Sequence, residues 1–129
     1  MIQVEKLTKS FSKRTLFHDL DLTINDGEII GIIGPSGTGK STFLRCLLLL
    51  EQPDSGKILL DGTDLITASS SEIDDARKRI GMVFQNFNLF GHMSVIENVM
   101  SGMVHLQGVD PDTAYEEAMR LLREVGLRD

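Results

Sequence analysis

The sequence predicts an α/β fold built around a phosphate-binding loop, and three observations carry that prediction. Residues 29–33 form an apolar run with a β-branched bias, which is typical of a strand buried on both faces. A glycine-rich turn follows, and the pattern G-x-x-x-x-G-K-[ST] is satisfied by Gly34, Gly39, Lys40 and Ser41. Lys40 then opens a leucine-rich segment of helical length, so the motif stands between a strand and a helix.

The spacing of this loop suits the chemistry of a triphosphate. A backbone with few Cβ groups curls closely around an anion, and amides at a helix N-terminus add a dipole that favours negative charge. The motif assigns Lys40 to the β- and γ-phosphates and the Ser41 hydroxyl to Mg²⁺. The predicted phosphate site comprises Gly34, Pro35, Ser36, Gly37, Thr38, Gly39, Lys40, Ser41 and Thr42.

Composition excludes several classes of protein. The chain has 129 residues, enough for one compact domain with a sizeable core. A net charge of −6 with no basic face argues against a general nucleic-acid binder. The single cysteine, Cys46, lies among leucines and is expected to be a buried thiol in a reducing cytoplasm. No apolar run reaches the length of a membrane span and the N-terminus lacks the features of a signal peptide, so any membrane connection is expected through a partner.

The residues before the loop predict a small antiparallel β region. Residues 2–8 alternate between apolar and polar, which is typical of a half-buried strand. Residues 16–24 contain a second, partly alternating strand, and residues 25–27 (Asn-Asp-Gly) are a turn signal. Phe11 lies in a polar stretch between these strands, where the pattern alone does not assign it a role.

The segment after the loop predicts a helix over 40–50 that is apolar nearly all round and therefore packs against a sheet. Residues 53–56 (Pro-Asp-Ser-Gly) end it, and residues 57–61 form a short strand. This strand ends in Asp61, as in the acidic strands that hold Mg²⁺ in phosphate-loop enzymes. Gly62 follows in place of a carboxylate base, which favours an ordinary turn.

Residues 70–79 carry acids early and bases late, which predicts a solvated helix. Residues 80–84 are a second candidate for a buried strand, and this strand ends at Gln85. Residues 86–93 hold four large apolar side chains, more than a solvent loop usually shows. Two interpretations stay open: a surface for a partner, or side chains that fold back into the core.

The last part of the chain predicts two helices. Residues 94–106 begin with Ser94 and Glu97 at the spacing of a capping box. A final helix begins at Asp110–Pro111 and ends at Gly126. The three histidines have no second ligand at metal spacing, so surface or core positions are expected for His18, His92 and His105.

With these parts in order, the chain resembles the ATP-binding subunit of an ABC transporter over its whole length. The matching segments are residues 34–42, 53–56 and 79–85. Residues 86–90 and 94–99 resemble importers of polar amino acids in particular. The phosphate-loop match is common to many families, whereas the match over the glutamine loop, Gly81 to Phe90, is much more specific to this family.

The resemblance implies site residues that the patterns alone do not. By resemblance Phe11 stacks on adenine, and Gln85 helps to hold Mg²⁺ and the attacking water. Lys40 and Gln85 are then the catalytic residues. ATP and Mg²⁺ are the implied cofactors. The implied partners are transmembrane permease subunits, which the loop after Gln85 meets, and a second nucleotide-binding subunit. The protein is then expected in the cytoplasm, at the inner face of the membrane. Gly91 departs from the proline that usually precedes the histidine here, which concerns the permease contact and not the nucleotide site.

The family would continue past Asp129 into a signature sequence and an acidic strand, so the chain resembles the N-terminal half of such a domain. In that reading residues 1–27 are the β region, 28–85 the phosphate-loop core, and 86–129 the glutamine loop and the start of a helical subdomain. Two alternatives stay open. One is a half-domain that binds nucleotide or permease without turnover. The other is a different phosphate-loop enzyme such as a small-molecule kinase, although the chain has no arginine-rich lid after the core.

Overall fold

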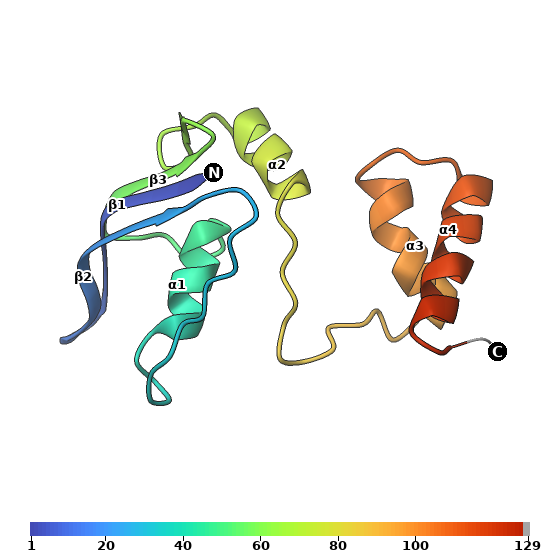
Figure 1. Ribbon diagram of the computed structural model, residues 1–129, viewed down its shortest axis with the longest axis horizontal. Helices are drawn as coiled ribbons and strands as arrows, with labels where there is room; N and C mark the ends of the chain where they lie inside the picture. The colour runs from blue at the N-terminus through green and yellow to red at the C-terminus, as the bar shows by residue number, and fades with distance from the viewer. Residues whose placement is uncertain (128–129) are drawn as a thin grey trace. The chain divides into compact units, whose positions relative to one another are not determined.

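A computed structural model describes residues 1–127 of the chain. The chain divides into two compact units, Met1–Ile80 and Gly81–Asp129, and each is described by itself (Figure 1).

The first unit contains a four-stranded antiparallel sheet in the order β2-β1-β3-β4. Its strands are β1 (Ile2–Phe11), β2 (Arg14–Ile24), β3 (Ser55–Leu60) and β4 (Thr63–Asp64). The predicted antiparallel β region is therefore confirmed, and its second strand is one continuous element. Alternation of apolar and polar residues predicts β1 and β2 correctly, because this pattern is typical of strands with one buried face.

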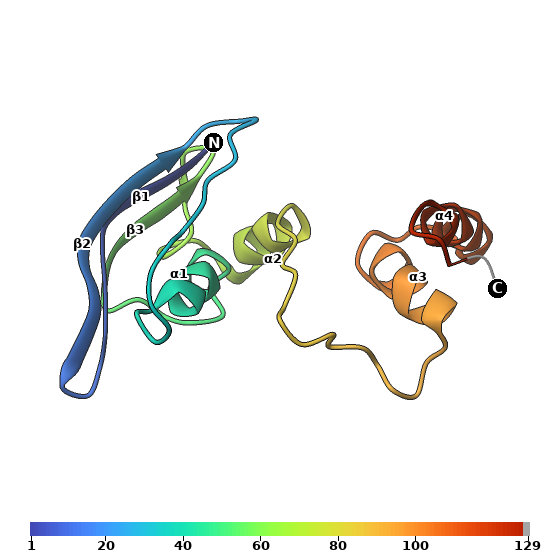
Figure 2. The ribbon, with the colours of Figure 1, turned by 60° about the horizontal axis from the view of Figure 1, so that its bottom comes forward.

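Helices α1 (Lys40–Leu47) and α2 (Ser70–Lys78) lie on the same face of this sheet (Figure 2). Leu7 of β1, Cys46 of α1 and Ile58 of β3 are almost completely buried, which confirms the expected burial of Cys46. Burial raises the pKa of the Cys46 thiol above its ordinary value, because the charged thiolate is disfavoured away from water. The core cluster of this unit comprises Val4, Leu7, Phe43, Cys46, Ile58, Leu60, Leu65 and Ala76.

Helix α1 ends at Leu47 and does not continue to residue 50 as its apolar pattern predicts. The chain turns at Leu49, whose φ of 54° lies in the left-handed region, and the Leu50 amide donates back to the Arg45 carbonyl at 2.9 Å. Arg77 of α2 donates to the carbonyls of Leu48 and Leu49 at 3.2 and 3.0 Å. The end of α1 is therefore fixed by a side chain 28 or more residues away, which no local pattern reveals.

The two strands predicted to be buried on both faces are wrong. Residues 29–33 form no strand, and Ile29 and Ile33 are 99% and 98% exposed. Residues 80–84 also form no strand, and Val83 is 98% exposed. A strand is buried on both faces only when neighbouring strands pair with it, and the four strands of the described sheet pair among themselves instead.

The second unit contains the helices α3 (Val95–His105) and α4 (Pro111–Glu124), which pack against each other. Both predicted helices are confirmed. Ala114 and Ala118 of α4 are fully buried, so small side chains allow the two helices to approach closely. Ser94 and Glu97 form the predicted capping box at the start of α3.

Candidate phosphate-binding site

The phosphate loop curls around the side chain of Lys40. The Lys40 Nζ atom donates to the carbonyls of Gly34 and Pro35 at 2.6 and 2.7 Å. The Thr38 hydroxyl donates to the same Pro35 carbonyl at 2.8 Å, which closes the curl from the other side. The ammonium group of Lys40 therefore lies inside the loop, where the sequence motif requires a cation.

Gly39 joins this loop to α1, and only glycine suits the position. Its φ is +100°, and a Cβ atom built on it would lie 3.0 Å from the Leu16 Cβ atom of β2. A side chain here would be strained and would also push the loop away from the sheet. The glycine is thus required both by the turn and by the close packing of the loop on β2.

The N-terminus of α1 carries no side-chain cap. The first helical hydrogen bond runs from the Phe43 amide to the Gly39 carbonyl at 2.8 Å, so helix geometry gives no partner to the amides of Lys40, Ser41 and Thr42. Unpaired amides and the positive end of a helix dipole together attract an anion. These three amides and the Lys40 ammonium are therefore suited to hold phosphate oxygens.

The remaining loop residues also lie where an anion can reach them. Pro35, Ser36, Gly37 and Thr38 are exposed, as is Ser41 in the first turn of α1, whereas Thr42 is half-buried. The structure thus gathers the nine predicted residues from Gly34 to Thr42 into one solvent-accessible turn.

A cavity of about 420 Å³ lies beside this turn, between β2, residues 30–33 and α1. Its lining is mainly aliphatic and aromatic, with Leu20, Leu22 and Phe43 among the residues that form it. Such a lining suits hydrophobic side chains rather than a triphosphate. The predicted phosphate site therefore corresponds better to the curl of the loop than to the aliphatic part of this cavity, which Thr38, Gly39 and Lys40 also line.

Phe11 lies at the end of β1 and is 47% exposed. It is not part of the core cluster, and the Lys9 ammonium lies 4.8 Å from the centroid of its ring. The hairpin that follows Phe11 and the phosphate loop lie toward the same end of the first unit in both Figures 1 and 2. Exposure of the ring favours a role on the surface over a role in the core.

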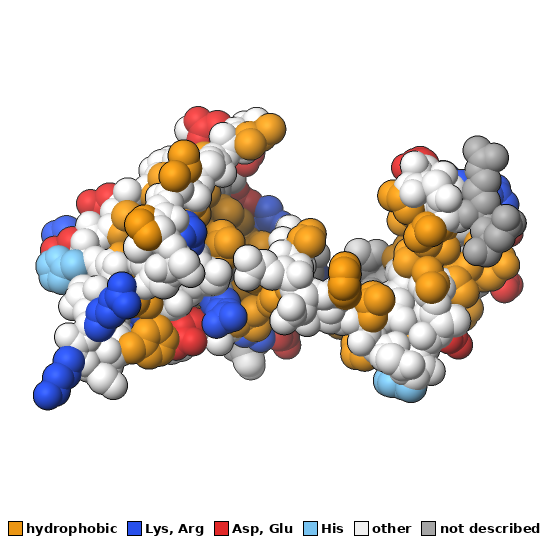
Figure 3. All heavy atoms as spheres, turned by 90° about the horizontal axis from the view of Figure 1, so that it is seen from below, with side chains coloured by type: hydrophobic (Ala, Val, Ile, Leu, Met, Phe, Trp, Pro, Cys, Tyr) orange, Lys and Arg blue, Asp and Glu red, His pale blue; other side chains and the backbone are white. Residues whose placement is uncertain are grey.

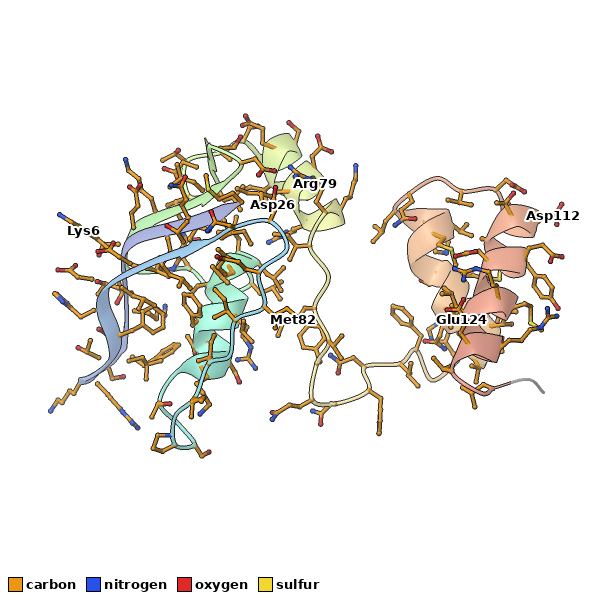
Figure 4. All side chains as sticks on the ribbon, in the orientation of Figure 1. Lys6, Asp26, Arg79, Met82, Asp112 and Glu124 are labelled. Atoms are coloured by element: carbon orange, nitrogen blue, oxygen red, sulfur yellow. The ribbon has the colours of Figure 1, made fainter. Side chains whose placement is uncertain are left out.

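Asp61 is engaged at the turn between β3 and β4. Its carboxylate accepts hydrogen bonds from the N-terminal ammonium of Met1 at 2.7 Å and from Arg79. These two cations lower the pKa of Asp61 to about 2. The Asp26 carboxylate accepts a hydrogen bond from the same ammonium at 2.6 Å. Asp26 and Arg79 are labelled in Figure 4. The contacts of Asp61 are those of a structural turn residue.

Gln85 belongs to the second unit, in an exposed stretch that leads into the segment 86–93. Phe87 is 92% exposed and Leu89 is 67% exposed. Figure 3 shows hydrophobic side chains gathered on the drawn face of the second unit. Of the two interpretations of this segment, the structure therefore favours a surface for a partner.

Asn98 of α3 holds this segment in place, and the sequence patterns do not single it out. Its side-chain oxygen accepts from the Phe90 amide at 2.8 Å. Its side-chain nitrogen donates to the carbonyls of Phe90, Met93 and Ser94 at 3.2, 3.3 and 2.9 Å. The one available signal is an amide side chain directly after Glu97 of the capping box.

We predict that α3 loses protection as the pH falls toward acid. The backbone amide of Ser94 donates to the Glu97 carboxylate at 2.7 Å, and this bond lowers the Glu97 pKa below its ordinary value of 4.5. A depressed pKa means that this stabilisation is present above the unfolded value and is lost as the pH falls through the folded value. Hydrogen exchange of the α3 amides measured between pH 7 and pH 3 checks this prediction.

Glu72 occupies the same position in the capping box of α2 and serves as the matched control. Glu97→Gln should flatten the pH response of α3 only, and Glu72→Gln that of α2 only. If α3 responds equally to acid with and without Glu97, the capping box is not the cause.

Comparison with known proteins places the chain in a family. The family whose description is "ABC transporter" matches residues 17–129. An arginine transport ATP-binding protein of Bacillus subtilis is 49% identical over 127 residues, which is 98% of this chain and 52% of that protein. An L-cystine transport system ATP-binding protein of Escherichia coli is 44% identical over 131 residues, again 98% of this chain and 52% of the relative. The chain thus spans about half the length of the curated relatives it matches.

A solved structure agrees with these sequence matches. A dimeric ATP-binding cassette in a post-hydrolysis state, bound to ADP and phosphate, superposes with a TM-score of 0.83 at 28% identity. The match covers 95% of this chain and 56% of the cassette. These findings confirm the α/β phosphate-loop fold as an incomplete domain, and they decide against the small-molecule kinase. The chain belongs to the ABC transporter family and is similar to the ATP-binding proteins of amino-acid transport systems.

Proposed function

We propose that the protein binds Mg-ATP at the phosphate loop and serves as an ATP-binding subunit of a transporter for the uptake of a polar amino acid. The observation that carries the proposal is the position of the Lys40 ammonium inside a loop that ends in uncapped amides of α1. The transport systems of the relatives, for arginine and for L-cystine, support a polar amino acid as the substrate.

The donors present fit a magnesium triphosphate. The loop offers amides, one ammonium group and the exposed Ser41 hydroxyl, which are the groups that phosphate oxygens and a hard cation need. Within residues 1–127, no group of three or more His, Cys, Asp or Glu side chains could hold a metal ion. In this proposal the Ser41 hydroxyl and the Gln85 side chain are the protein groups that would hold Mg²⁺, and the ion would neutralise charge on the phosphates. In this proposal residues 28–85 belong to the nucleotide core and residues 86–129 to the start of the helical subdomain, whereas the compact units of the structure divide after Ile80.

The proposed partners are permease subunits and a second ATP-binding subunit. The side chains of Phe87 and Leu89 are exposed, in a segment whose Phe90 backbone is held by Asn98, and they offer an apolar surface to the permease. The dimeric cassette supports a second subunit. Among the described helices, none is long and apolar enough to cross a membrane. In this proposal the protein works in the cytoplasm, at the inner face of the membrane, where the permease holds it.

Phe11→Ala is expected to weaken ATP binding by about 1–3 kcal/mol, because base–aromatic stacking is of that size. Binding of inorganic triphosphate should stay nearly unchanged, since that ligand has no base. Titration calorimetry with the two ligands checks the prediction. Equal losses for both ligands would mean that Phe11 supports the fold and not the base.

The 129-residue chain is expected to bind Mg-ATP without releasing phosphate at a useful rate. Hydrolysis needs a group that positions or deprotonates water in addition to charge stabilisation. The described hydrogen bonds of the loop involve Lys40, Thr38 and backbone carbonyls, with no carboxylate among them. Binding is measured by calorimetry and turnover by steady-state phosphate release.

Lys40→Ala provides the background for the release assay. Turnover well above that background would show that these residues suffice for hydrolysis. Absence of both binding and turnover would contradict the proposed function itself. Binding without turnover is the result expected for the chain alone, and it is also how a half-domain that only binds nucleotide would behave.

A further inference from the structure

Lys9 of β1 is buried although it carries a charge, with only 8% of its surface exposed. Its Nζ atom donates to the Gln52 carbonyl at 2.7 Å and lies 3.1 Å from the Glu51 carboxylate. A carboxylate oxygen of Asp54 is 3.8 Å away. These partners compensate for the burial of the ammonium group, which would otherwise be costly.

The segment 51–54 holds the same part of β1 through its backbone as well. The Asp54 amide donates to the Thr8 carbonyl at 2.8 Å, and the Ser10 amide donates to the Asp54 carboxylate at 2.7 Å. Residues 8–10 are therefore attached to the segment that follows α1 at three successive positions. Phe11 is the next residue along the strand, so its backbone is fixed by these contacts.

The Lys9 ammonium also contacts the Phe11 ring directly. It lies 4.8 Å from the ring centroid, over one face, which is within the range of a cation–π interaction. Since Phe11 is still 47% exposed, the cation covers only part of the ring. A cation on one face draws π-electron density toward itself, and the opposite face then repels an electron-rich purine less.

We propose that Lys9 is a positioning residue for the nucleobase: it fixes the Phe11 ring from one face so that adenine stacks on the other. The inference rests on the proposed function, because it assumes that Phe11 meets the base. Beyond that function, the inference assigns a role to the buried Lys9 cation, which Glu51, Gln52 and Asp54 hold. These three residues follow α1, so the segment after α1 would help to position the ring that meets the base. Lys9 touches neither the base nor the phosphates.

Lys9→Met tests the proposal, with Lys57→Met as the matched control. Met keeps most of the apolar stem and removes the charge. Lys57 is an exposed lysine of β3, so its replacement changes the net charge equally. Affinities for ATP and for inorganic triphosphate are measured for each variant. We expect Lys9→Met to reduce the ratio of these affinities by about three- to tenfold, the scale of a partly buried cation–π contact, and Lys57→Met to leave it unchanged.

A double-mutant cycle shows whether Lys9 acts through Phe11. In a Phe11→Ala background, Lys9→Met should leave the ratio unchanged, because the ring that it orients is gone. Lys9→Arg should restore the ratio, since the cation is kept. Lys9→Gln keeps a donor for the Gln52 carbonyl without the charge, and serves if Lys9→Met does not fold.

Three results would overturn the proposal. One is an equal loss for both ligands, which indicates a merely structural lysine. Another is a ratio that Lys9→Met and Lys9→Gln leave unchanged while Phe11→Ala lowers it. The third is a wild-type protein that binds triphosphate as tightly as ATP, which removes the base contact but leaves the phosphate site standing. Failure to bind either ligand would instead contradict the proposed function, and this inference with it.

Discussion

Lys40→Ala is expected to weaken Mg-ATP binding by about 2–5 kcal/mol, the cost of removing one partner of a desolvated charge pair. The Lys40 Nζ atom lies inside the loop, within 2.7 Å of two backbone carbonyls. In the proposed complex it turns from these carbonyls to phosphate oxygens, and no other ammonium group among the described residues donates to the loop. Titration calorimetry at fixed Mg²⁺ measures the change.

Lys57→Ala is the control for the loss of one positive charge, because Lys57 is an exposed residue of β3. It should leave the affinity for Mg-ATP nearly unchanged. Circular dichroism confirms that both variants keep their helices. If the wild type and Lys40→Ala bind Mg-ATP with the same affinity, the loop is not part of the binding site.

Gly56→Ala is expected to destabilise the first unit by about 3 kcal/mol or more, at the high end for a single substitution. Gly56 has a φ of +103°, and a Cβ atom there would lie 2.6 Å from both the Leu7 Cα atom and the Lys6 carbonyl oxygen. These neighbours belong to the backbone of β1, so they cannot move aside as a flexible side chain could. Denaturant unfolding measures the loss as a lower midpoint.

Gly62→Ala separates the clash from the strain of the backbone. Gly62 has a similar φ of +87°, but its Cβ atom would have no neighbour within 4 Å. The cost is then only that of a left-handed residue with a side chain, about 1–2 kcal/mol. If both substitutions lower the free energy of unfolding by the same amount, then the backbone of β1 moves to accommodate the new Cβ atom. The close approach of β1 to β3 would then not matter for stability.

The elements predicted correctly are those whose signals are local. Ser94 and Glu97 lie three residues apart and satisfy each other at the start of α3. Residues 2–8 alternate with the period of a strand, and β1 pairs with β2 through a short hairpin. In such cases the residues that decide the structure are close in sequence, so a pattern contains the whole cause.

The strands predicted at 29–33 and 80–84 failed for the opposite reason. Their apolar composition indicates that burying these segments would be favourable. Burial on both faces, however, requires neighbouring strands that pair with them. Among the described residues the four strands of the sheet pair with one another, and Ile29 and Val83 are exposed. A composition can show that a segment is suited to a sheet, whereas only the partners decide whether it joins one.

The residues of the site were likewise predicted where their signal is local and missed where it is not. Residues 34–42 follow from one contiguous motif, and the structure places them in one turn. Lys9 was missed because its partner carbonyl is 43 residues away in the sequence, and a lysine in an alternating strand is usually a solvated one. Asn98 was missed because its hydrogen bonds go to the backbone of the loop, and backbone acceptors leave no trace in the sequence.

Helix α1 has only eight residues, fewer than a helix needs to be stable by itself in water. Arg77 supports its C-terminal end, but among the described residues no side chain caps its N-terminal amides. A bound phosphate would therefore be the N-cap of α1 as well as the ligand of the loop. Any ligand that binds only the folded form shifts the folding equilibrium toward that form. Under the proposed function, nucleotide concentration and the stability of the first unit are linked, and this unit is least stable when nucleotide is scarce.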